Sequence, residues 1–126
     1  MIRARLAYVQ EALTHRDLLV RTYDAFNARD IERVLAAMHP EVDWPNGMEG
    51  GYLHGHDAVR EYWTRQWRMI DPRVEPRGFT VDERGHVVVE VHQVVRDLTG
   101  KMVTDHTVQH VYRIEDGLIR RMEIKR

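Results

Sequence analysis

Residues 23–31 read YDAFNARDI, and residues 32–40 continue as ERVLAAMHP. Leu19, Tyr23 and Phe26 recur at the spacing of one helical face. Asp30 suits the N-cap of a second helix, because its short carboxylate can accept a free backbone N–H. The apolar positions 31, 34, 35 and 38 follow the i, i+3, i+4, i+7 pattern, and Pro40 cannot continue a helix. Two helices joined at Asp30 are therefore predicted.

Composition indicates one globular, cysteine-free domain. The chain has 126 residues, of which 43% are apolar and 31% charged, a balance that supports a packed core. The absence of cysteine excludes disulfides, thiolate metal sites and cysteine nucleophiles. A formal net charge of −1 gives no general attraction to nucleic acid or anionic membranes. Residues 1–10 lack the apolar core of a signal peptide, so we expect a cytoplasmic protein.

Helical signals extend on both sides of residues 23–31. No proline or glycine interrupts residues 3–27, although Thr14 marks a candidate break that would make residues 1–17 a separate N-terminal helical extension. After Pro40, residues 41–44 predict a short strand and residues 45–55 a glycine-rich loop. A third helix is predicted from His56 or Asp57 to about Ile70.

The second half of the chain predicts a sheet. Strands are expected over residues 74–81, 86–97, 102–114 and 118–125, with turn signals between them. Short connections of this kind produce an antiparallel meander. Helices packed on the concave face of such a curved sheet leave a cleft between the two layers. The fold class is therefore α+β, with an internal cavity.

Three motifs resemble one family. Residues 23–40 resemble the second-helix region of the NTF2-like superfamily, residues 55–63 (GHDAVREYW) its third helix, and residues 110–119 (HVYRIEDGLI) its last hairpin. The resemblance covers residues 18–124 and is strongest to the SnoaL-like and ketosteroid-isomerase-like branch. It implies a cone-shaped barrel with an apolar cavity and a dimer formed through the sheet. It does not imply one reaction, because this superfamily holds both enzymes and binding modules.

The catalytic positions of this branch are only partly matched. The resemblance implies Thr22 at the tyrosine position of ketosteroid isomerases, Asn46 at the base position and His110 at the sheet aspartic acid. An amide cannot abstract a proton, so classical steroid isomerisation is not expected. Asp43 is the nearest carboxylate, and it is also interpretable as a solvated strand residue. The residues of a limonene-epoxide-hydrolase site are absent, because the aligned positions are Val91, Gln93 and Ile124.

Histidine offers the main remaining chemistry. His106 and His110 are four residues apart on one strand and point to the same face. We predict His110 as a general acid or base, or as a hydrogen-bond donor to a ligand, with a buried structural histidine as the alternative. Asp43 is the second catalytic candidate, and no metal site or cofactor is predicted. The predicted pocket residues are Trp44, Asn46, His54, Trp63, Trp67, Gln93, His106, Tyr112 and Met122.

Two functional hypotheses follow from these residues. The first is a pocket for an apolar small molecule, polyketide-, steroid- or terpenoid-like, with acid–base chemistry at His110. The second is a module without turnover whose pocket is filled by Trp63, Trp67 and Met122.

An outward apolar face on residues 86–97 predicts assembly. Val88, His92 and Val94 would face away from the cavity, and a homodimer through the sheet would cover them. The alternative is that residues 3–13 fold back over this face. Neither nucleic acid nor membrane is an expected partner.

Overall fold

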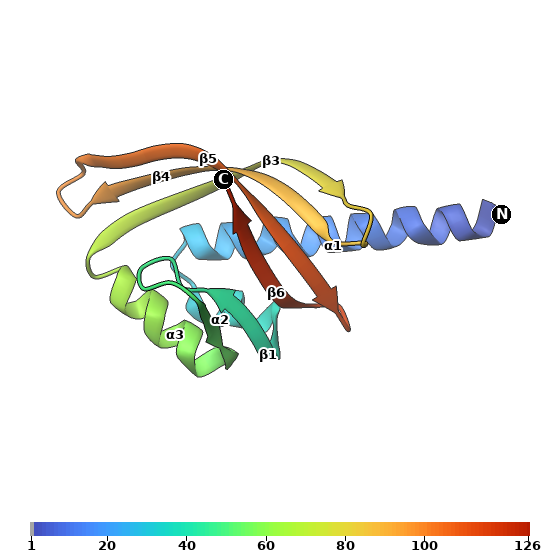
Figure 1. Cartoon of the computed structure of the whole chain (residues 1–126), viewed down its shortest axis with the longest axis horizontal. Helices are drawn as coiled ribbons and strands as arrows, with labels where there is room; N and C mark the ends of the chain where they lie inside the picture. The colour runs from blue at the N-terminus through green and yellow to red at the C-terminus, as the bar shows by residue number, and fades with distance from the viewer. Residues whose placement is uncertain (1) are drawn as a thin grey trace.

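A curved sheet wraps over three helices in the computed structural model, which describes residues 2–126 and the side chains of residues 9–126 (Figure 1). The α+β prediction is confirmed. The sheet has six strands in the order β2-β1-β6-β5-β4-β3, with β1 and β6 parallel and all other pairs antiparallel. It is not closed, because β2 and β3 form its edges. The elements are α1 (Ile2–Asn27), α2 (Ile31–Ala36), β1 (Met38–Pro45), β2 (Tyr52–His54), α3 (Gly55–Gln66), β3 (Ile70–Val81), β4 (Val87–Asp97), β5 (Met102–Glu115) and β6 (Leu118–Lys125).

Two helices are shorter than their sequence patterns predict. Asp30 caps α2 as expected, because its side chain accepts the N–H of Arg33. The helix ends at Ala36, however, and Met38 already pairs with Ile119 of β6. Likewise, α3 ends before Ile70, which pairs with Asp97. In both places strand pairing across the sheet outweighs a local helical pattern.

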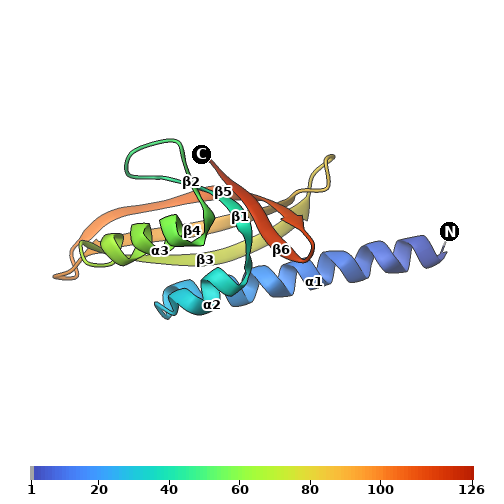
Figure 2. The ribbon, with the colours of Figure 1, turned by 90° about the horizontal axis from the view of Figure 1, so that it is seen from below.

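The N-terminal helix is continuous and does not fold back. Thr14 donates its hydroxyl to the carbonyl oxygen of Gln10 at 2.9 Å, so it bonds within the helix and starts no new one. Figures 1 and 2 show the N-terminal part of α1 running past the sheet. Val9 and Leu13 are 52% and 48% exposed. The alternative in which this segment covers the sheet is wrong, and Met1 lies outside the described residues.

The outer face of β4 is less apolar than its sequence suggests. Val88, His92 and Val94 point away from the buried residues, as predicted. His92, however, contacts Asp105 on β5 at 2.5 Å and Arg77 on β3 at 3.1 Å. Polar pairs therefore interrupt the apolar face, and the homodimer through this face stays a prediction.

Asn27 anchors the end of α1 to the edge strand β3. Its side-chain Nδ2 donates to the carbonyl oxygen of Val74 at 2.7 Å, and its Oδ1 accepts the backbone N–H of the same residue at 3.0 Å. An edge strand exposes such backbone groups. Asn27 therefore takes the place that a neighbouring strand would occupy and closes one end of the layer beneath the sheet.

We expect Asn27→Leu to lower the free energy of unfolding by about 2 kcal/mol, because it leaves two backbone groups unpaired. Asn27→Asp should cost less, since its carboxylate still accepts the N–H of Val74. Urea unfolding of both variants and the wild type provides the measurement. Equal stability of Asn27→Leu and wild type would contradict this role.

Candidate functional site

A cavity of about 350 Å³ lies between the helices and the concave face of the sheet. Its walls come from the three helices and from strands β1, β3, β4, β5 and β6, so segments far apart in sequence enclose it. Three aromatic rings form much of the apolar wall: Trp63 packs edge-on against Phe26 and against Trp44, with centroids 5.3 Å apart in each pair. Such walls suit a flat apolar ligand.

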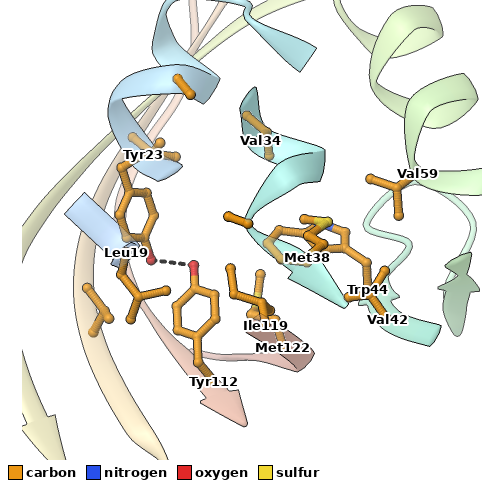
Figure 3. Packing of buried hydrophobic residues seen from close by; sticks show 14 of the residues in the cluster. Leu19, Tyr23, Val34, Met38, Val42, Trp44, Val59, Tyr112, Ile119 and Met122 are labelled. Carbon is orange, nitrogen blue, oxygen red and sulfur yellow. Dashed lines mark hydrogen bonds between the residues drawn. The ribbon is translucent and has the colours of Figure 1, made fainter. Parts of the chain in front are cut away.

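Three polar side chains meet at one side of this cavity. The Tyr23 hydroxyl lies 2.8 Å from Nδ1 of His110, and the Tyr112 hydroxyl donates to that of Tyr23 at 2.7 Å. Figure 3 shows the two tyrosine hydroxyls facing one another between α1 and the sheet. Tyr23 comes from α1, and the other two residues come from alternate positions of β5 that share its concave face.

This arrangement sets the tautomer of His110. Because Tyr23 accepts the proton of Tyr112, its own hydroxyl proton is directed to Nδ1 of His110. The neutral ring then carries its proton on Nε2, which has no hydrogen-bond partner among the described residues and retains solvent-accessible surface. His110 therefore presents an N–H donor to the cavity.

Burial keeps the three groups uncharged. Desolvation lowers the pKa of His110 from 6.5 to about 4, because a buried imidazolium loses its hydration. Burial also raises the pKa of Tyr112 and, together with the neighbouring Tyr112, that of Tyr23. At neutral pH the site is a set of neutral hydrogen-bond groups. A neutral imidazole here is a poor proton acceptor and a good donor to a carbonyl oxygen.

Tyr62 ties the loop at residues 46–51 to the cavity wall. The side-chain amide of Gln66 donates to its hydroxyl at 3.2 Å, and the backbone N–H groups of Gly47 and Met48 lie near the same oxygen. Asn46 organises the same loop, because its side-chain oxygen accepts the N–H of Met48 at 3.2 Å. The exposed side chain of Met48 thereby lies at the rim of the cavity.

Asp43 and His54 lie outside the cavity. They alternate with the inward-facing Trp44 on β1 and its partner strand, so they belong to the opposite face. Asp43 bonds to His54 at 2.9 Å and faces Arg120 and Arg121 at 3.5 and 3.4 Å. The hydrogen bond from His54, with both arginines, lowers the pKa of Asp43, and the same carboxylate raises the pKa of His54. These contacts describe an ion-pair network on the surface.

The remaining predicted residues divide between the cavity and its surroundings. Asn46 supports the loop, as described. Trp67 stacks on Trp63 with centroids 6.1 Å apart, and the guanidinium group of Arg29 lies 5.2 Å from the centre of the Trp67 ring. Neither Trp67 nor Arg29 lines the cavity. The predicted residues that line the cavity are Trp44, Trp63, Gln93, His106, His110, Tyr112 and Met122.

Sequence reasoning missed Tyr23, Tyr62 and Gln66. The ungapped alignment favoured Thr22, which also lines the cavity but uses its hydroxyl on the carbonyl oxygen of Leu18 at 2.8 Å. The apolar stripe of Leu19 and Tyr23 already placed Tyr23 inward and was the better signal. In α3, Tyr62 and Gln66 are four residues apart and share one face.

One group of residues has the spacing of a metal site. His39, Glu115 and Asp116 bring three ligand atoms within 4.8 Å of one another. Nδ1 of His39 accepts the N–H of Glu41 at 3.0 Å. In the neutral ring the remaining proton then lies on Nε2. Neither nitrogen has a free lone pair, so this group fits a metal ion poorly.

A family model described as the SnoaL-like domain matches residues 19–122. The chain belongs to the SnoaL-like family. This agrees with the resemblance seen in the sequence and with the position of the cavity. Residues 2–18, the protruding part of α1, precede the matched region. No helix among the described residues has the length and apolarity needed to cross a membrane.

Solved structures similar to this SnoaL-like chain include TerC co-crystallised with polyporic acid, at 30% identity and a TM-score of 0.76, covering 88% of this chain and 89% of that one. An NTF2-like protein of unknown function from Burkholderia pseudomallei has the same identity and TM-score and covers 88% of both chains. An epoxide hydrolase of the LEH-like kind from M. tuberculosis, at 17% identity and a TM-score of 0.75, covers 90% of this chain and 83% of that one and shares the fold. No curated protein matches the chain.

Proposed function

We propose that this protein binds an apolar, largely aromatic small molecule and polarises a carbonyl oxygen of that molecule through His110. The observation that carries the proposal is the Nε2–H of His110, which faces a cavity walled by aromatic rings and has no partner among the described residues. A ligand oxygen would replace water at this donor, and a hydrogen bond in such apolar surroundings is stronger than one in bulk water.

The hydrogen bonds around His110 favour a role as hydrogen-bond donor over a role as general base. Tyr112 and Tyr23 direct a proton toward Nδ1, which leaves the donor on Nε2. The lowered pKa of His110 works in the same direction, because proton transfer to this ring is disfavoured at neutral pH. A neutral donor stabilises the negative charge that develops on a carbonyl oxygen during enolisation or ring closure.

The relatives support a small-molecule ligand. TerC was co-crystallised with polyporic acid, and the structure of a putative polyketide cyclase from Sinorhizobium meliloti has the same fold. The alternative of a pocket filled by the chain's own side chains is less favourable, because Trp63 and Met122 line an open cavity and Trp67 lies outside it.

We expect 2-acetylnaphthalene to bind the wild-type protein about ten-fold more tightly than the His110→Asn variant, which corresponds to one hydrogen bond of about 1.4 kcal/mol. Asparagine can still accept the Tyr23 hydroxyl but cannot reach the position of Nε2. Naphthalene, which has no carbonyl group, should bind both proteins equally. Quenching of tryptophan fluorescence would report the affinities.

His92→Asn is the matched control, because His92 lies on the outer face of the sheet. The affinity of the His92→Asn variant for 2-acetylnaphthalene should equal that of the wild type. Absence of 2-acetylnaphthalene binding, or equal affinity in the His110→Asn variant, would overturn the proposal.

A further inference from the structure

A second polar group lines the same cavity, away from His110. Nε2 of His106 lies 3.3 Å from the side-chain oxygen of Gln93, and the Thr104 hydroxyl lies 3.2 Å from Nδ1 of His106. Gln93 and His106 face one another across β4 and β5. Neither contact involves the Tyr23, His110 and Tyr112 group, so the cavity holds two separate polar positions.

The side-chain NH₂ group of Gln93 is available to a ligand. The side-chain oxygen of Gln93 can only accept a hydrogen bond, so Nε2 of His106 carries a proton and donates it to that oxygen. The NH₂ group of Gln93 then has two N–H donors and no partner among the described residues. What this position offers a ligand is therefore hydrogen-bond donation, as at His110.

The charges around the cavity favour an acceptor or an anion. No aspartate or glutamate is among the described residues that line it, whereas Arg126 does line it. Val103 and Ile124, two exposed apolar residues, also belong to this wall and mark its solvent-open rim with Met48. A cation would find no counter-charge here, but a carboxylate at the open end keeps partial hydration and gains donors.

The register of the sheet sets the separation between the two polar positions. His106 and His110 are four residues apart on β5, about 13 Å along an extended strand. Between them lies the Val91–Val108 pair, 0% and 4% exposed. A ligand that contacts both positions must therefore have an elongated apolar body and polar groups at its two ends.

We propose that Gln93, held by His106, forms a second subsite that binds a carboxylate at the end of the ligand opposite the carbonyl group. This rests on the proposed function of His110 and adds the ligand class: an elongated aromatic keto acid. Gln93 is then the residue that distinguishes an acid from the corresponding neutral ketone.

The test compares 6-acetyl-2-naphthoic acid with 2-acetylnaphthalene, which differ only in the carboxylate. We expect the acid to bind the wild type on the order of ten-fold more tightly, as for one charge-assisted hydrogen bond. Gln93→Leu should remove this advantage, so that the variant binds the acid no more tightly than it binds 2-acetylnaphthalene. His110→Asn should weaken both probes by the same factor. Isothermal titration calorimetry at neutral pH would measure all six combinations of protein and probe.

Gln109→Leu is the matched control, because Gln109 lies exposed on the outer face of β5, and it should keep the full advantage of the acid. Normal binding of 2-acetylnaphthalene without an advantage for the acid overturns the subsite alone. An advantage that persists in Gln93→Leu also overturns it. An affinity for 2-acetylnaphthalene that His110→Asn does not change overturns the proposed function itself.

Discussion

Lowering the pH from 7 to 4 should destabilise the wild-type protein by about 3 kcal/mol more than the His110→Asn variant, because the pKa of His110 falls from 6.5 in the unfolded chain to about 4 in the folded one. In the unfolded chain the ring takes up a proton as the pH falls through 6.5. In the folded protein it stays neutral until about pH 4. The unfolded state therefore binds more protons than the folded state between pH 6.5 and about pH 4. The free energy of unfolding consequently decreases as the pH is lowered through this range.

The comparison with His110→Asn isolates this one group. Asparagine does not titrate, yet it preserves an acceptor for the Tyr23 hydroxyl. The carboxylates with lowered pKa values, such as Asp43 and Asp82, are distant enough from His110 to contribute equally in both proteins. Urea unfolding at a series of pH values provides the measurement. Parallel stability curves for the two proteins would show that His110 is not buried in its neutral form.

Trp63→Ala should lower the free energy of unfolding by about 4 kcal/mol, the largest single effect that we expect. Trp63 is 3% exposed. Its ring contacts Phe26, Trp44 and Trp67 and so joins α1, β1 and the segment after α3. Removing it deletes a large buried surface and leaves a void beside an existing cavity, which the fixed sheet cannot close by collapse.

The control for Trp63→Ala is Met69→Ala, a nearby truncation at a residue that is 45% exposed, whose effect should stay within about 0.5 kcal/mol. Calorimetric melting of both variants would separate the two. A cost below 1 kcal/mol for Trp63→Ala would mean that the aromatic cluster is not packed as described.

Alternation along the strands was available from the sequence and located much of the cavity wall. Val89, Val91, Gln93 and Val95 of β4 share a face because strand side chains alternate, and that face is the concave one. The same rule applied to His106, His110 and Tyr112 of β5. Applied one step further, it would have excluded Asp43, because the adjacent Trp44 points inward.

The sequence alone determined the helices-then-strands order, the α+β class, the cap at Asp30 and most of the inward-facing residues, because these depend on local periodicity. Tertiary structure decided what depends on pairing between distant segments. It made Met38 a strand residue beside Ile119. It also brought Tyr23 within 2.8 Å of His110, a contact across 87 residues that fixes the proton position on His110. No local pattern encodes that distance, since it depends on how far the sheet curves over α1.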